Sequence, residues 1–200
     1  PSDKVTLSNI GKGAEEADHA MSALALTGFP VKNGWQIPLP NVGEHGGAGG
    51  MAMQAMIQVR SIGINSSREA VYYNAYTDAD LKPLSGRNSY TITFAKNQIP
   101  PVDKARYGFW SLTIYDRTNA RLIESSANKY SIRSADDLVY GPDGSLTLYI
   151  QPKPPADKAL MANWLPCDSG GDFILALRVY LGGNEVTSGS YIPAPIVKNP

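Results

Sequence analysis

The sequence predicts a mainly β fold, a jelly-roll-like antiparallel β-sandwich preceded by one or two helices. From Ala70 onward, apolar and polar residues alternate with a period of two, which is typical of strands with one buried face. Roughly seven or eight such stretches follow one another, separated by turn residues such as Gly, Pro, Asn and Asp. Short strands separated by turns are typical of sandwiches and jelly rolls, whereas parallel α/β sheets alternate strands with helices.

Two stretches near the start have helical spacing instead. In residues 14–26 and 51–62, small or apolar side chains recur three and four positions apart, so each stretch predicts a helix with one apolar face. Residues 29–50 are rich in Pro and Gly and show no period, so we interpret them as a connector or arm. The sequence therefore predicts an N-terminal helix and arm over residues 1–50 and a β-sandwich domain over residues 51–200.

A strand at residues 108–116 organises the predicted sandwich. Trp110, Leu112 and Ile114 fall on one face of its pleat and polar residues fall on the other, because successive strand side chains alternate. We expect the face with Trp110 to lie in the core. The other predicted strands are residues 71–77, 89–95, 121–123, 129–132, 145–151 and 173–181.

The charge and composition of the chain indicate which classes of partner to expect. The 18 Lys and Arg residues balance the 18 Asp and Glu residues, so no basic surface is expected to recruit nucleic acid. No run of about 18 apolar residues occurs, so no membrane-spanning helix is predicted. A net charge of zero gives little self-repulsion, which favours a homo-oligomer. The start at Pro1 is neither an initiator Met nor a signal peptide and indicates a processed chain or one cut from a longer protein.

The residue types that usually carry catalysis or bind metals are sparse. His19 lies in the first predicted helix and His45 in the glycine-rich connector, and neither has a second ligand at metal-binding spacing, so no metal or cofactor is predicted. Cys167 stands alone, and the sequence places neither histidine beside it as a base. The glycine run at residues 43–50 lacks the Gly-Lys-Ser/Thr ending of a phosphate loop, and we interpret it as a hinge.

A set of aromatic and polar residues remains as the candidate site. Arg178 lies in a strand whose other face is apolar, so it needs a partner, and we expect Asp116 to supply the carboxylate. Two interpretations stay open: a buried structural ion pair with tyrosines around it, or a pocket for a small polar or cyclic ligand between aromatic walls. The candidate ligand-binding residues are Trp110, Tyr115, Asp116, Tyr130, Asn163, Trp164, Arg178 and Tyr180.

Four sequence blocks carry a resemblance to a known family. They are residues 60–72, residues 109–116, residues 143–151, and residues 162–166 followed by 177–180. In order and spacing they resemble bacterial proteins with the DUF1214 domain, usually the C-terminal half of DUF1254/DUF1214 proteins. The resemblance covers about residues 51–195. Cys167 and Asp168 stand where the family usually has Ala-Pro, so the resemblance says nothing about the thiol.

The resemblance implies a jelly-roll-like sandwich that is commonly exported, and hence a periplasmic or secreted location. Two-domain members of this family look similar to double jelly-roll capsid subunits, but the family has no agreed chemistry. We therefore expect a binding or self-assembling module that forms a homo-oligomer, with a small molecule or a glycan as its ligand. The alternative is an enzyme that acts on a small or polymeric polar substrate in a pocket lined by aromatic residues and Arg178.

Overall fold

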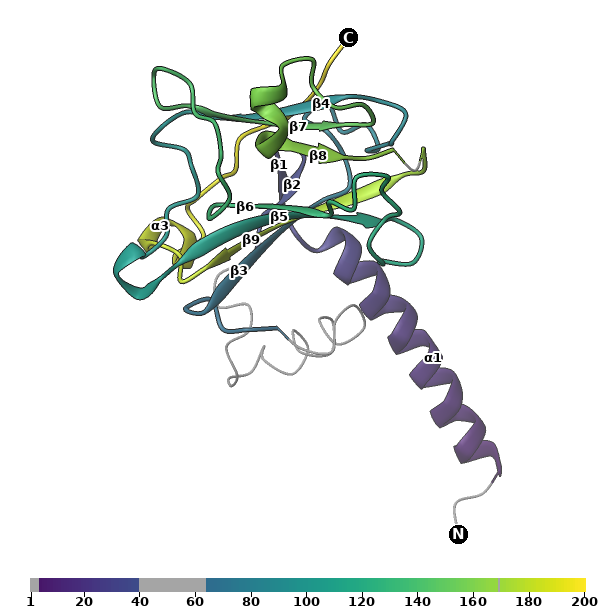
Figure 1. Cartoon of the computed structure of the whole chain (residues 1–200). Coiled ribbons are helices and arrows are strands. Elements are labelled where there is room, and N and C mark those ends of the chain that lie inside the picture. Colours follow the sequence, from purple (N-terminus) through teal and green to yellow (C-terminus); the bar gives the residue numbers. More distant parts are fainter. Residues whose placement is uncertain (1–3, 40–63, 169) are drawn as a thin grey trace.

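The computed structural model describes residues 4–39, 64–168 and 170–200, which form a two-layer β-sandwich and a helix that stands apart from it (Figure 1). The helices are α1 (Lys4–Thr27) and α3 (Asn184–Thr187), with short 3-10 helices η1 (Lys104–Arg106) and η2 (Lys158–Asn163). The strands are β1 (Val31–Lys32), β2 (Trp35–Gln36), β3 (Ala70–Ala75), β4 (Tyr90–Phe94), β5 (Phe109–Asp116), β6 (Ser131–Arg133), β7 (Leu146–Gln151), β8 (Trp164–Pro166), β9 (Phe173–Tyr180) and β10 (Ile196–Lys198).

The strands form two sheets that pack face to face. One sheet has six strands in the order β1-β2-β3-β9-β5-β6, and the other has four in the order β10-β4-β7-β8. The predicted mainly β sandwich is therefore confirmed. One pair departs from the antiparallel expectation, since β7 and β8 are parallel. The chain reaches β8 through η2 rather than through a tight turn, and parallel neighbours require such a crossover.

The core lies between the sheets and follows the predicted alternation. Trp110, Leu112 and Ile114 of β5 are at most 2% exposed, so the predicted buried face is confirmed. The inward residues of β9, from Phe173 to Val179, and the apolar residues of β4 and β7 complete this core. Burying each such side chain stabilises the fold by roughly 1.5 to 3 kcal/mol, so these strands hold the two sheets together.

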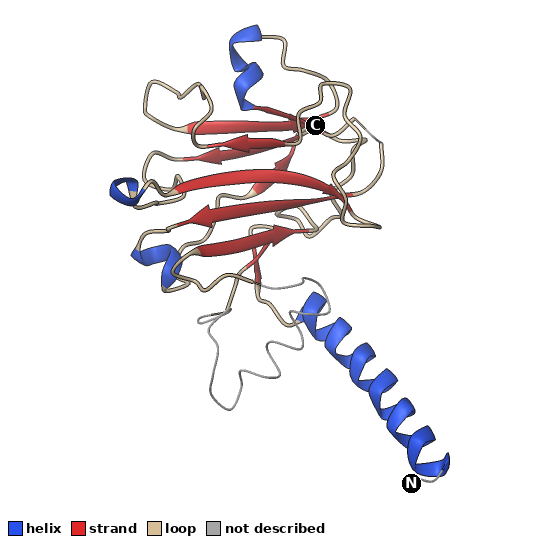
Figure 2. Cartoon of the chain, turned by 60° about the horizontal axis from the view of Figure 1, so that its bottom comes forward, coloured by secondary structure: helices blue, strands red, loops and turns tan. Residues whose placement is uncertain are grey.

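Of the two predicted helices, the first is confirmed. The stretch predicted over residues 14–26 belongs to α1, which begins ten residues earlier at Lys4. Figure 2 shows α1 extending away from the sandwich. The second predicted helix, residues 51–62, lies outside the described residues, as does His45. No helix within the described residues is both long and apolar enough to cross a membrane.

The remaining differences concern very short elements. Residues 121–123 were predicted as a strand but contribute a single bridge, Tyr115 to Leu122, because a tight turn follows β5. The strands β1, β2, β8 and β10 have two or three residues each, which is too short for a period to be read. Trp35 of β2 lies in the stretch that we interpreted as a connector, yet it is fully buried and its Nε1 donates to the Ala194 carbonyl at 2.9 Å.

Candidate functional site

Arg178 lies near the centre of the outer face of the six-stranded sheet. Its neighbours in the sequence, Leu177 and Val179, point into the core, so the strand alternation directs Arg178 outward. Its register partners are Tyr72 on β3 and Ser111 on β5, so it stands between two strands of the same sheet. Around it lies a group of side chains that we call the arginine–tyrosine cluster, made up of Tyr72, Phe109, Tyr115, Arg178 and Tyr180.

Aromatic rings hold the guanidinium group. Its Nη2 donates a hydrogen bond to the Tyr115 hydroxyl at 2.9 Å, and its Cζ lies 5.3 Å from the centre of that ring. The same Cζ lies 5.9 Å from the centre of the Tyr72 ring. Beside them, the rings of Tyr180 and Phe109 stack with centres 4.5 Å apart and planes 16° apart. Cation–π contacts of this kind contribute roughly 0.5 to 2 kcal/mol each, so the rings fix the position of the cation.

The floor under the cluster is made of small residues. Ser111 and Thr113 are each 9% exposed and Ala176 is 4% exposed, although all three lie on the outer face of the sheet. Tyr115 pairs with Ile174 whereas Arg178 lies four residues further along β9, so the two long side chains meet above Ala176. They thereby cover the small residues, and Arg178 itself is partly buried.

The Tyr72 hydroxyl is also held in place. It accepts a hydrogen bond from Asn65 Nδ2 at 2.9 Å. Burial raises the pKa of Tyr72, as does the nearby Tyr180, whereas Arg178 and Asn65 oppose this shift. The phenol is therefore protonated at neutral pH and keeps its own proton to donate.

The expected ion pair between Arg178 and Asp116 is wrong. Asp116 Oδ1 accepts hydrogen bonds from the Thr118 and Asn119 backbone N–H groups at 2.8 and 3.1 Å and from the Thr118 hydroxyl. The hydrogen bonds from Thr118 lower the pKa of Asp116. An Asp at the end of a strand favours such a local turn, and here the carboxylate accepts its hydrogen bonds from that turn rather than from Arg178. Arg178 turns instead to the Tyr115 hydroxyl, and within the described ranges the ion pair present joins Arg133 to Asp136.

The other predicted residues lie elsewhere. Trp110 is in the core against Phe94, with ring centres 6.5 Å apart. Asn163 is 1% exposed and exchanges hydrogen bonds with the backbone of Val139 at 2.9 and 2.7 Å. Trp164 Nε1 donates to the Gln151 carbonyl at 2.8 Å. Tyr130 precedes β6, and its hydroxyl donates to Asn128 at 3.3 Å.

The structure thus brings three of the eight predicted residues together: Tyr115, Arg178 and Tyr180. Two members of the cluster, Tyr72 and Phe109, were missed. Each lies in the outward phase of its strand, which the sequence shows. The register that sets Tyr72 opposite Arg178, and Phe109 opposite Tyr180, joins strands far apart in the chain, and no local pattern reports it.

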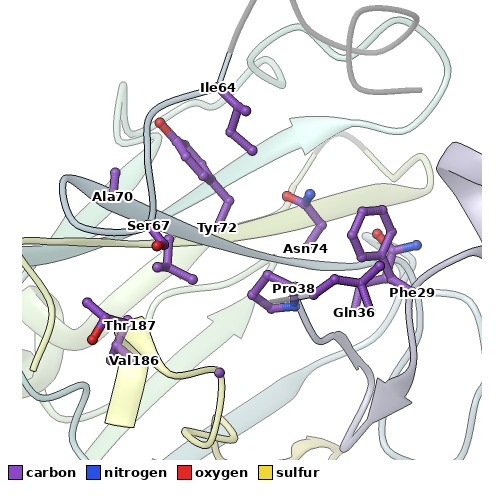
Figure 3. A pocket seen from close by; sticks show the side chains of 13 residues that line it. Phe29, Gln36, Pro38, Ile64, Ser67, Ala70, Tyr72, Asn74, Val186 and Thr187 are labelled. Carbon is purple, nitrogen blue, oxygen red and sulfur yellow. The ribbon is translucent and has the colours of Figure 1, made fainter. Parts of the chain in front are cut away.

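A pocket of about 80 Å³ adjoins the cluster at the edge of β3 (Figure 3). Among the described residues, β2 pairs with Asn74 and Ala75 of β3, and no described strand pairs with the first half of β3 on that side. Figure 3 shows Tyr72 and Asn74 rising from β3 into this pocket, with Val186 of α3 on its other side. Tyr72 therefore borders both the pocket and Arg178.

Catalytic side chains near the cluster are not evident in the described ranges. Cys167 is fully buried, and burial raises the pKa of its thiol to about 12, so it is not a nucleophile near neutral pH. His19 is exposed on α1. No group of three His, Cys, Asp or Glu side chains within the described ranges could hold a metal ion. The described residues of the cluster can therefore bind a ligand through cation–π contacts and by donating hydrogen bonds.

The fold and the cluster define a two-sheet β-sandwich protein with an aromatic and cationic outer face. A family model described as a protein of unknown function (DUF1214) matches residues 69–184. The chain therefore belongs to the DUF1214 family, as its four sequence blocks predicted. No curated protein matches it.

The chain resembles solved structures, and two of them are the following. The VPA0106 protein from Vibrio parahaemolyticus matches with a TM-score of 0.68 and 19% identity, over 100% of this chain and 47% of its own. An uncharacterised protein from Burkholderia cenocepacia matches with a TM-score of 0.43 and 15% identity, over 100% of this chain and 43% of its own. The first likeness shows the fold alone. The chain spans less than half the length of these two proteins.

Proposed function

We propose that the chain is a self-associating binding module and that copies meet through α1. The observation that carries this proposal is the exposure of a long helix. α1 has 24 residues, and every α1 side chain that the structure describes is exposed, including Ile10 at 63%. Figures 1 and 2 both show it standing away from the sandwich.

An exposed helix of this composition needs a partner. Most helical stability in proteins comes from packing an apolar face, and isolated helices are marginal in water. α1 also contains Gly11 and Gly13, each of which costs about 1 kcal/mol relative to Ala in a helix interior. Packing against another surface would supply the missing stability.

The spacing in α1 supports another helix as that surface. The apolar residues at positions 7, 10, 14, 17, 21 and 24 alternate in steps of three and four, which is the heptad pattern of helices that pack side by side. Polar residues such as Lys12 and His19 fall on the opposite side of the helix. A second copy offers the same stripe, and the net charge of zero does not oppose association.

The mass of the protein in solution tests this proposal. Sedimentation at increasing concentration is expected to give an oligomer for the natural sequence. Ala17→Glu places a charge in the apolar stripe and should return the protein to a monomer, whereas His19→Glu, on the opposite side of the helix, should leave the mass unchanged. A monomer at high concentration, or equal effects of the two substitutions, would contradict the proposal.

The family resemblance supports two further proposals. The full-length protein is exported to the periplasm or secreted, and fractionation of cells that produce it tests that location. A DUF1254-like domain accompanies this one in the same protein, and sequencing the complete gene tests that arrangement.

A further inference from the structure

We propose that the arginine–tyrosine cluster is a binding site for the carboxylate group of a ligand that has a flat apolar body. The inference goes beyond self-association and does not depend on it, because the cluster lies on the sandwich and shares no residue with α1.

The first argument is the unmet charge of Arg178. A guanidinium group has five N–H donors, and the described residues supply one acceptor, the Tyr115 hydroxyl. Arg178 is partly buried, and no carboxylate of the described residues pairs with it. A partly buried cation without a counter-charge is costly, so an incoming anion is favoured there.

The second argument is the fixed orientation of the group. Contacts with the Tyr72 and Tyr115 rings and the hydrogen bond to Tyr115 hold the guanidinium in one place before any ligand arrives. The guanidinium group is a planar fork of N–H donors, and held in this way it matches the two oxygens of a carboxylate. Little side-chain freedom is therefore lost on binding. The Tyr72 hydroxyl, which accepts from Asn65, keeps a proton that it can donate to the same anion.

The third argument concerns the choice among anions. The cluster contributes one positive charge, and the Arg133 guanidinium on the neighbouring strand is already paired with Asp136. One arginine balances a singly charged carboxylate better than a phosphate of charge near two. The surrounding surface is made of rings, with Tyr180 stacked on Phe109, and such surfaces favour a flat apolar body.

Sodium benzoate is a suitable probe, because it joins one carboxylate to one ring. Its binding is followed by NMR of the tyrosine ring signals in the natural protein, with benzyl alcohol and inorganic phosphate as comparison probes. We expect benzoate to shift the signals of Tyr72 and Tyr115 saturably. Benzyl alcohol, which has the ring without the charge, and phosphate, which has the charge without the ring, should each bind at least about tenfold more weakly.

Substitutions then assign the contact to Arg178. Arg178→Lys keeps the charge but removes the fork, and should weaken benzoate binding about tenfold. Tyr115→Phe removes only the hydroxyl that orients the fork and should weaken binding by about two- to threefold. The matched control is Arg121→Lys, an exposed arginine in the turn after β5, which should bind benzoate as the natural protein does.

Two measurements decide the source of the carboxylate: sedimentation of the natural protein with and without benzoate, and the benzoate titration repeated on Ala17→Glu. If benzoate lowers the mass of the natural protein, the natural ligand is a carboxylate of a second copy. If the mass is unchanged and both proteins bind benzoate, the natural ligand is a separate molecule. The proposal is overturned if benzoate shifts no tyrosine signal, if benzyl alcohol binds as well as benzoate, or if Arg178→Lys binds it unchanged. Should Arg178→Lys fail to fold, the three probes on the natural protein still decide the matter.

Discussion

Arg178 is held by aromatic rings rather than by a carboxylate, which changes what its substitution should do. Arg178→Met keeps an apolar stem over Ala176 and leaves no buried charge behind, but it removes the cation–π contacts with Tyr72 and Tyr115, so it should cost about 1 kcal/mol. Arg178→Ala uncovers the small residues beneath and should cost about 1 to 2 kcal/mol. Urea unfolding of both variants measures the difference. Equal losses for Met and Ala would show that the charge, which both variants lack, matters more to stability than the apolar stem, which only Ala lacks.

Asn163 is a structural residue by its contacts. Its side chain bonds both backbone groups of Val139 and the Thr147 carbonyl, the last at 2.9 Å. Asn163→Ala leaves these groups without partners in a buried place and should lower the free energy of unfolding by about 3 kcal/mol. The control Asn97→Ala, at an exposed turn, should change it by less than about 0.5 kcal/mol. Equal losses in a urea titration would contradict this role.

Asp116 should make stability depend on acid. Its pKa is lowered from 3.8 by the hydrogen bonds from Thr118, so its contribution is fully present above that value and is lost as the pH falls through the lower folded-state pKa. The natural protein should therefore melt at a higher temperature than Asp116→Ala at pH 7, and the difference should shrink as the pH falls below the ordinary carboxyl pKa of 3.8. Asp137→Ala, at an exposed residue, is the control. A difference that persists in acid would show that the charge is not responsible.

At the level of elements, the sequence predicted those that are long enough to show a period. β5 and β9 have eight residues each, and their buried faces follow the alternation. The two-residue strands β1 and β2 show no period, although Asn33 and Gly34 between them are typical of a tight hairpin turn. The candidate site was predicted only in part because strand register, not local pattern, sets which outward residues meet.

That hairpin turn gives a prediction of its own. Gly34 has φ of 89°, and a Cβ there would lie 2.5 Å from the Thr77 carbonyl oxygen. Gly34→Ala should therefore cost about 3 kcal/mol, from backbone strain of about 1 kcal/mol together with the clash. Gly170→Ala is the matched control: its φ is 73°, but an added Cβ there would have no atom of the described residues within 4 Å apart from its chain neighbours, so it should cost only about 1 kcal/mol. Equal thermal shifts would show that strain alone matters.

At the level of the whole molecule, the sandwich and α1 should behave as separable parts. No residue of α1 belongs to the core cluster within the described ranges, which is built from both sheets and the segments around them. Removing residues 1–28 should therefore leave the urea midpoint of the sandwich nearly unchanged. Because α1 carries the stripe through which copies are proposed to meet, the same deletion should abolish the oligomer in sedimentation. A large fall in the midpoint would instead mean that α1 packs on its own sandwich, and an oligomer that survives the deletion would move the interface to the sheets.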